Sequence, residues 1–434
     1  MVLNTASSPF TVFERLESNI RSYCRSFPAS FAKAKGSTLT DTQGRDYLDF
    51  FAGAGALNLG HNPPALRDAI IQHLMNDGLS HALDMYTPAK EAFLKTLDEV
   101  ILRPRGLNYR VQFTGPTGTN AVEAALKLAR KITGRTNVVA FTGGYHGHSL
   151  GSLAATANRE HRQAAHIPLS GATFVPFPNG AYSHIDGLAY LRSLLVDTHS
   201  GLDLPAAVIL ETVQGEGGIW VAPTQWLKDV RALCDEFGIV MIVDEIQTGC
   251  GRTGPFLSFE RAGIVPDMVT ISKSISGFGL PMSIVLIKPD LDIWQPAEHT
   301  GTFRGNQLAF VSAEIGLRQF EDLNLATQTT QRGEQLVAQL SAQMAEIDPR
   351  IEVRGLGLMI GLDFHELDNT GQLAKQISRL CFDRQLIIER VGRMDTVVKL
   401  MPPLTITDAE LREGVELIVQ VVREVVADWA GKGH

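Results

Sequence analysis

Several features that mark particular protein classes are scarce in this chain of 434 residues. It holds four cysteines, and their spacing forms neither a disulfide framework nor a zinc site: Cys24, Cys234, Cys250 and Cys381. No run reaches the roughly 18 apolar residues of a membrane-spanning helix. The N-terminus has no basic segment followed by an apolar one, so we expect no secretory signal and a cytoplasmic location.

Positive charge is also scarce. The net charge is −8, whereas a general nucleic-acid binder is usually basic, so we expect no nucleic-acid partner. Hydrophobic residues make up 44% and charged residues 20%, which is ordinary for a globular protein. We find no repeat and no low-complexity tract. Cys234 and Cys381 lie in helical apolar patterns, where we expect buried thiols.

Short apolar runs alternate with helical periodicity through the middle of the chain. The runs read as buried strands at Val138–Phe141, Ala207–Leu210, Val240–Val243 and Met268–Ile271. A helix is predicted over Pro223–Glu236, between the second and third runs. Strand–helix–strand units of this length predict a parallel sheet covered on both faces.

The pattern changes after about residue 326. We predict a helix at 327–347, a strand–turn–strand at 350–364 and a helix at 371–382. A strand follows at 397–400, and a final helix begins with a capping box at 407–410. These predict a smaller α/β domain over residues 327–434. A large domain would cover 61–326, and residues 1–60 would pack with the smaller domain.

Three chemically active residues follow predicted strands, namely Glu211, Asp244 and Lys273. Ligands of parallel sheets bind beyond the carboxyl ends of the strands. A single lysine is usually a solvated charge, and a single aspartate after a strand is usually a turn former. Together they fit pyridoxal phosphate: the lysine amine forms a Schiff base with its aldehyde, and the carboxylate keeps its pyridine nitrogen protonated.

A phosphate site and ring contacts are also indicated. Residues 114–120 are small and open onto a helical segment, and free amides at a helix N-terminus favour an anion, although such a loop alone also describes a plain turn. Tyr145 follows a strand and can stack on a flat ring or be a core tyrosine. His146 and His148 have no carboxylate or cysteine cluster nearby in sequence, so we expect no metal. Glu211 and Glu216 belong to a glycine-rich loop that we expect near a site.

In this order, and over nearly the whole length, these motifs resemble the class III, ω-amino-acid type aminotransferases that use pyridoxal phosphate. The resemblance implies fold type I of this cofactor's enzymes: an α/β protein with a mostly parallel seven-stranded sheet in the large domain and a smaller α/β domain. It also implies a homodimer, or a dimer of dimers, with shared active sites.

The resemblance assigns roles around the cofactor ring. Lys273 matches the Schiff-base lysine and Asp244 the partner of the pyridine nitrogen. Ile246 would pack on the ring face opposite Tyr145, and Gln247 would hydrogen-bond the ring hydroxyl.

It assigns further roles around the phosphate. Gly118 and Thr119 match the phosphate loop, and Thr302 matches a threonine that reaches the phosphate bound in the other subunit. His146 and Glu211 complete the expected cofactor-binding set.

Within the family, the chain is most similar to diaminobutyrate–2-oxoglutarate aminotransferases of the ectoine-pathway type. The matching segments are residues 17–28, 50–58, 115–123, 272–281 and 301–306. This implies a reversible ping-pong reaction in which L-glutamate aminates L-aspartate 4-semialdehyde, giving L-2,4-diaminobutyrate and 2-oxoglutarate. The alternatives are an aminotransferase for ornithine, 4-aminobutyrate or a polyamine, a same-fold aminomutase, and a cofactor-binding protein without turnover, which the intact Asp244–Lys273 pair disfavours.

One departure from the wider family concerns the substrate. Many relatives have an arginine that grips the α-carboxylate of glutamate, and a glutamate that screens it; here Glu216 is present but Lys399 replaces the arginine. A lysine is a point charge without the bidentate fork. We expect an exposed, weak Glu216–Lys399 pair that a substrate carboxylate displaces. Otherwise Arg304 or Arg25 takes the carboxylate.

Overall fold

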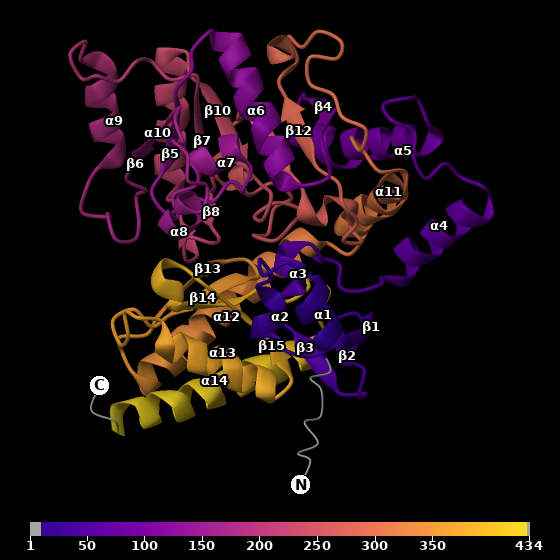
Figure 1. Ribbon diagram of the computed structural model, residues 1–434, viewed down its shortest axis with the longest axis vertical. Helices are drawn as coiled ribbons and strands as arrows, with labels where there is room; N and C mark the ends of the chain where they lie inside the picture. The colour runs from indigo at the N-terminus through magenta and orange to yellow at the C-terminus, as the bar shows by residue number, and fades with distance from the viewer. Residues whose placement is uncertain (1–9, 432–434) are drawn as a thin grey trace.

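The computed structural model describes residues 10–431, which form an upper and a lower body in Figure 1. The upper body is built on a seven-stranded sheet in the order β4-β12-β11-β10-β7-β5-β6. In that order its strands are Arg110–Phe113, Ile284–Ile287, Met268–Ile271, Val240–Asp244, Ala207–Leu210, Val138–Phe141 and Ala172–Val175. Only β12 runs antiparallel to its neighbours, so the predicted mostly parallel sheet is confirmed.

Both faces of this sheet are buried. In β10, Val240 and Ile242 belong to the same apolar cluster as α6 (Gly118–Thr133). The alternate residues Met241 and Val243 belong to the cluster that contains the buried face of α10 (Thr224–Phe237). Successive side chains of a strand point to opposite faces, and both sets are apolar here, which explains why the strands read as continuous apolar runs.

The other helical elements of the upper body surround this sheet (Figure 1). The α-helices are α4 (Pro64–Met75), α5 (Pro88–Thr96), α7 (Leu150–Ala155), α8 (Arg159–Gln163), α9 (Gly187–Val196) and α11 (Gln307–Asp322). The short helices are η1 (Leu97–Leu102), η2 (Arg103–Arg105), η3 (Ser258–Ala262), η4 (Lys273–Ser276) and η5 (Pro289–Leu291). A two-stranded ribbon of β8 (Val213–Gln214) and β9 (Trp220–Val221) follows β7.

The lower body carries a second sheet in the order β13-β14-β17-β16. Its strands are Glu352–Leu356, Met359–Asp363, Val397–Leu400 and Glu389–Val391 in that order, with η6 (Arg393–Asp395) between β16 and β17. Its helices are α12 (Leu325–Ile347), α13 (Gln372–Asp383) and α14 (Asp408–Gly431). All of these except β16 and η6 were predicted from the sequence, with ends that differ by a few residues.

The N-terminal elements lie beside this lower body in Figure 1. They are α1 (Thr11–Leu16), α2 (Tyr23–Ser26), β1 (Phe31–Lys35), β2 (Thr38–Asp41), β3 (Asp46–Asp49) and α3 (Ala52–Gly55). β3 pairs in parallel with β15 (Leu386–Ile387), which joins the start of the chain to its C-terminal third.

The burial of the cysteine side chains can be compared with the prediction from the sequence. Cys234 and Cys381 are buried as predicted; Cys250 is also buried, and Cys24 is exposed. Among residues 10–431, no helix has the length and apolar character needed to cross a membrane.

Candidate active site

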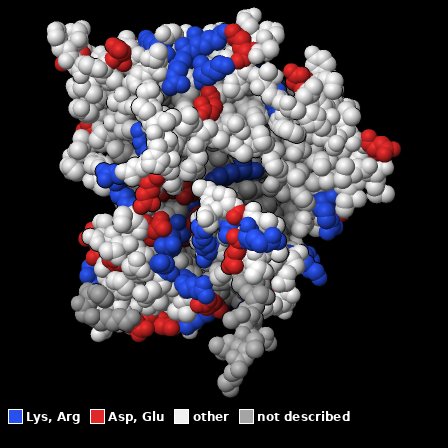
Figure 2. All heavy atoms as spheres, viewed as in Figure 1, with Lys and Arg blue, Asp and Glu red and all other residues white. Residues whose placement is uncertain are grey.

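A cavity of about 360 Å³ opens where β5, β7, β10 and β11 end. The face shown in Figure 2 is hollowed between the upper and lower bodies, with charged side chains of both signs beside the hollow. Ten of the twelve residues predicted for the site line the cavity: Gly118, Thr119, Tyr145, His146, Glu211, Glu216, Asp244, Ile246, Gln247 and Lys273. Thr302 and Lys399 do not line it.

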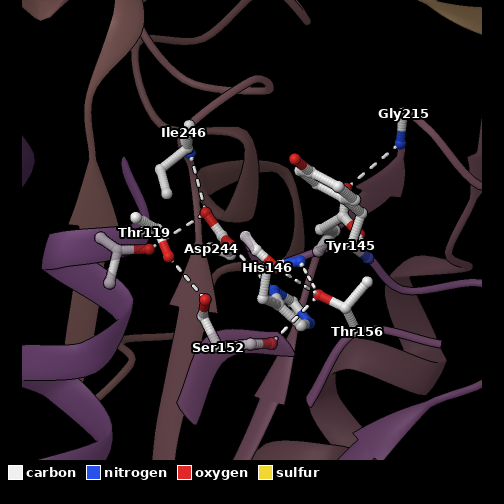
Figure 3. A network of polar contacts seen from close by, with 11 residues as sticks. Thr119, Tyr145, His146, Ser152, Thr156, Gly215, Asp244 and Ile246 are labelled. Atoms are coloured by element: carbon white, nitrogen blue, oxygen red, sulfur yellow. Dashed lines mark hydrogen bonds and ion pairs between the residues drawn. The ribbon is translucent and has the colours of Figure 1, made fainter. Parts of the chain in front are cut away.

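Asp244 is the last residue of β10 and is buried, 3% exposed. One carboxylate oxygen accepts hydrogen bonds from the Ile246 amide at 3.1 Å and the Thr270 hydroxyl at 3.0 Å. The other lies 2.8 Å from Nδ1 of buried His146 (Figure 3). Burial alone would lower the pKa of His146, but the Asp244 carboxylate outweighs it and raises that pKa. The pair therefore keeps an oriented carboxylate at the bottom of the cavity.

Lys273 begins η4, one residue after the end of β11. Its φ of +51° lies in the left-handed region, which costs a non-glycine residue of order 1 kcal/mol and is typical of functional sites. Burial lowers the pKa of its amine, and Glu216 opposes this shift. A lowered pKa makes the neutral, nucleophilic amine more accessible.

The predicted phosphate end lies at the N-terminus of α6. A capping box joins Thr117 to Asn120, whose side-chain oxygen accepts from the Thr117 amide at 3.2 Å. A Cβ added at Gly118 would come 2.8 Å from the end of the Ile246 side chain, which would have to move. Thr119 Oγ1 lies 2.6 Å from Ser149 Oγ and 2.5 Å from Ser152 Oγ. Hydroxyls and free amides here form an environment suited to an anion.

Glu211 fixes the loops that carry the ring contacts. Its carboxylate oxygens accept from the amides of Tyr145 at 2.9 Å and Gly215 at 3.2 Å. Burial raises the pKa of Glu211 to about 7. Glu211 was predicted for the cofactor site, and it lines the cavity. Its two hydrogen bonds connect the loop that carries Tyr145 to the loop that carries Gly215.

Gln247 supplies an independent test of whether pyridoxal phosphate fits. Its amide nitrogen donates to the Ala54 carbonyl at 3.3 Å and to Glu216 at 3.2 Å. Its Oε1 is buried and has no hydrogen-bond partner among the described residues. Buried polar atoms are normally satisfied, so this acceptor points to a missing donor. The ring hydroxyl of pyridoxal phosphate is such a donor, and the cavity residues fit this cofactor.

The Glu216–Lys399 contact is present, at 2.9 Å, but the expectation of an exposed pair is wrong. The Lys399 side chain is fully buried, because β17 is a central strand of the second sheet. Lys399 also lies 2.8 Å from Glu389, a residue that the sequence analysis missed. Burial alone would lower the pKa of Lys399, but the two carboxylates raise it, and Lys399 in turn holds the pKa of Glu216 down at about 2.

His148 also belongs to the site, although it was not among the residues predicted for it. It lines the cavity, and its ring centroid lies 4.6 Å from that of His161 and 5.5 Å from that of Tyr145. Within residues 10–431, no group of three or more metal-ligating side chains comes together. The two alternative anchors for the substrate carboxylate do not line the cavity. Arg25 donates to the Arg21 carbonyl, and Arg304 donates to the His299 carbonyl.

This chain is similar in sequence to known proteins. A family model described as aminotransferase class-III matches residues 22–422. A diaminobutyrate–2-oxoglutarate transaminase of Streptomyces anulatus is 54% identical over 415 residues, covering 95% of this chain and 98% of that protein. A protein of the same name from Vibrio cholerae is 52% identical over 415 residues, covering 95% and 100%.

Solved structures agree. The ornithine aminotransferase of Toxoplasma gondii, with partial occupancy of pyridoxal phosphate at its active site, matches with a TM-score of 0.82 at 25% identity. The match covers 99% of this chain and 97% of that one. Since the family model spans nearly the whole chain, this protein belongs to the class III aminotransferases and is a pyridoxal-phosphate-dependent enzyme of fold type I.

Proposed function

We propose that this enzyme transfers an amino group reversibly, by a ping-pong mechanism, from L-glutamate to L-aspartate 4-semialdehyde. The products are L-2,4-diaminobutyrate and 2-oxoglutarate. The proposal is supported by relatives named for this reaction, which are 52% and 54% identical along nearly the whole chain. The ornithine aminotransferase described above is only 25% identical, which disfavours ornithine as the substrate.

When bound, pyridoxal phosphate supplies an electron sink for the substrate carbon that loses its proton. Asp244 would hold the pyridine nitrogen protonated, with His146 orienting its carboxylate. Tyr145 and Ile246 would enclose the ring, and Gln247 would accept from its hydroxyl. Gly118 and Thr119 would bind the phosphate at the N-terminus of α6.

Lys273 would hold the cofactor covalently and then move the proton of the reacting carbon. The amine must be released and neutral to take the α-proton of glutamate, and burial favours the neutral form by lowering its pKa. The left-handed backbone at Lys273 places this residue at the cavity, one residue after the end of β11.

Glu216 would adapt the site to two different substrates. With glutamate, the α-carboxylate comes close to the ring; with diaminobutyrate, the 4-position reacts and carries no carboxylate. The Glu216 side chain is 34% exposed toward the cavity, whereas Lys399 behind it is fully buried. A substrate carboxylate would therefore replace Glu216 beside Lys399, and Glu216 would return when the ω-amino end reacts.

We also propose a homodimer in which Thr302 reaches the phosphate site of the other subunit. Thr302 is exposed, and its carbonyl accepts from His81 at 2.9 Å. Large apolar side chains are exposed in the two segments that this contact joins, namely Phe303 at 67%, Met85 at 57% and Tyr86 fully exposed. Exposed apolar residues gathered in this way favour burial against a second copy.

The test is an absorbance-monitored half-reaction of the purified holoenzyme with a panel of amino donors. Glutamate and diaminobutyrate should both convert the cofactor completely. Ornithine, 4-aminobutyrate and polyamines should react at least about tenfold more slowly, which corresponds to about 1.4 kcal/mol in the barrier. Faster conversion by one of these donors than by diaminobutyrate would contradict the proposed substrate.

A further inference from the structure

Lys399 lies between two carboxylates that belong to different parts of the chain. Glu216 comes from the loop between β8 and β9, and Glu389 comes from β16. Both carboxylates are within 3 Å of the ammonium, at 2.9 and 2.8 Å. The proposed exchange of substrates uses Glu216 and leaves Glu389 without a role.

Glu389 is held to Lys399 by the backbone. In the antiparallel pair β16–β17, Glu389 is directly opposite Lys399, so the two side chains share one face of the sheet. Glu216 is not paired with Lys399 in a sheet. Its backbone contacts the lower body through the Gly392 amide, which donates to the Glu216 carbonyl at 3.0 Å. Its side chain is 34% exposed, against 11% for Glu389. Glu389 is thus the fixed partner and Glu216 the movable one.

While one substrate is exchanged for another, the buried ammonium of Lys399 needs a carboxylate partner besides Glu216. Removing one partner of a buried ion pair leaves an uncompensated charge, which is strongly destabilising. If Glu216 were the only partner, its departure would leave the buried ammonium of Lys399 uncompensated. The Oε2 of Glu389 contacts Lys399 as an ion pair but receives no well-directed hydrogen bond within residues 10–431.

We propose that Glu389 is the permanent counter-ion of Lys399 and a positioning residue for substrate exchange. It neutralises the buried ammonium whenever Glu216 moves aside for a substrate carboxylate. This inference rests on the proposed function, because it requires a dicarboxylate to enter beside Lys399. It follows that loss of Glu216 alone leaves the cation neutralised, whereas loss of both carboxylates leaves it unpaired.

A double-mutant cycle tests this with glutarate, a five-carbon dicarboxylate that cannot transaminate. Calorimetry would measure its Kd for the wild-type holoenzyme, Glu216→Gln, Glu389→Gln and the double variant. Glu389→Gln alone should change the Kd less than about twofold, because the substrate merely replaces Glu216 beside Lys399 in either case. In the Glu216→Gln background the same change should tighten binding about tenfold, within the range of coupling between contacting residues. Equal effects of Glu389→Gln in both backgrounds would overturn the proposal.

Folding provides the second measurement. If the double variant does not fold, adding Lys399→Met should restore a wild-type-like Tm, because it removes the unpaired charge. Failure of this triple variant to fold would overturn the proposal. Glu413→Gln, an exposed change on α14, is the matched control and should alter neither Kd nor Tm. A wild-type holoenzyme that does not bind glutarate would contradict the proposed function itself, whereas binding without coupling would overturn this inference alone.

Discussion

Single residues at the strand ends carry features that folding by itself does not favour. Lys273 has a left-handed backbone, and Glu211 and Glu245 are buried carboxyls whose pKa values burial raises to about 7. They follow β11, β7 and β10, whose residues are all buried and, apart from Thr270 and Asp244, apolar. Strain and buried charge gathered at one edge of a sheet are typical of a catalytic site.

Lys273→Ala should abolish covalent attachment of the cofactor and slow the glutamate half-reaction by about 10²–10⁴-fold, the range for loss of a general acid–base group. Borohydride reduction of the wild-type holoenzyme followed by peptide mapping should place the cofactor on Lys273. The exposed Lys228→Ala is the matched control and should behave as wild type. An adduct on another lysine would refute the assignment.

Asp244→Asn should weaken cofactor binding and slow proton transfer. The change keeps the shape but removes the charge that faces His146, and breaking such a buried pair costs roughly 3–5 kcal/mol. The Kd of the cofactor and the half-reaction rate measure this. Asp229→Asn, on the exposed face of α10, should change neither value, and near-normal turnover of Asp244→Asn would place the pyridine partner elsewhere.

Glu245 should make stability fall as the pH rises. It is fully buried and accepts from the Thr248 hydroxyl and the Phe259 amide, yet burial raises its pKa to about 7. A carboxyl whose folded pKa is raised contributes stability below its unfolded pKa and loses it as the pH passes the folded value. The unfolding free energy of the wild type, relative to Glu245→Gln, should therefore drop by about 3 kcal/mol between about pH 4.5 and pH 8.

Urea unfolding at the two pH values measures this difference. Glu413→Gln serves as the control, and its difference from the wild type should not depend on pH. A pH-independent difference for Glu245→Gln as well would show that Glu245 is ionised in the folded protein throughout this range.

At the scale of elements, local signals predicted β5, β7, β10, β11 and most C-terminal elements, but not β4, β6 and β12 of the same large sheet. The capping box predicted at the start of α14 is confirmed: Glu410 accepts from the Thr407 amide at 2.9 Å, and the Glu410 amide donates to the Thr407 hydroxyl at 3.2 Å. The helix that follows buries an apolar face, which includes Val415, Ile418 and Val422. β16 was not predicted because it is only three residues long and carries two charged side chains.

Thr407→Ala should lower the unfolding free energy by about 1 kcal/mol, since it removes the hydroxyl that caps α14. Denaturant unfolding of the holoenzyme would measure it. Thr405→Ala is a matched change two residues earlier on the exposed chain and should cost little. Equal costs for both variants would contradict a role for the cap in stability.

At the scale of the whole molecule, the cavity is lined by the upper body, and the lower body contributes a charged residue that contacts Glu216 behind it. In the upper body, Asp244 ends β10 and Lys273 begins η4. In the lower body, Lys399 of β17 contacts Glu216, and Glu389 of β16 contacts Lys399. Gly392 of the lower body and the Glu216 loop of the upper body are hydrogen-bonded to one another. Movement between the two bodies would therefore reach the substrate side of the site directly.

A shared site can be tested by complementation between subunits. Thr302→Ala and Lys273→Ala chains should each be poorly active alone. Mixed and re-dimerised, they should recover up to about a quarter of wild-type activity, because half of the dimers are mixed and each holds one intact site. Mixed dimers verified by mass spectrometry that gain no activity would show that Thr302 does not serve the other subunit.

The sequence by itself determined the elements and the kind of chemistry. Apolar runs at strand length gave the buried strands, because both faces of a parallel sheet are covered. Asp244 and Lys273 could be found because each lies at the carboxyl end of such a strand, and the fold brings the ends of parallel strands to one edge.

Only the tertiary structure decided which partners these residues have. The contact of His146 with Asp244 depends on two strands far apart in sequence, and that of Glu389 with Lys399 depends on the register of β16 against β17. The expectation of an exposed Glu216–Lys399 pair was wrong for the same reason. Periodicity reports which side of an element is covered, but the packing of distant segments sets how deeply a charge is buried and how many opposite charges surround it.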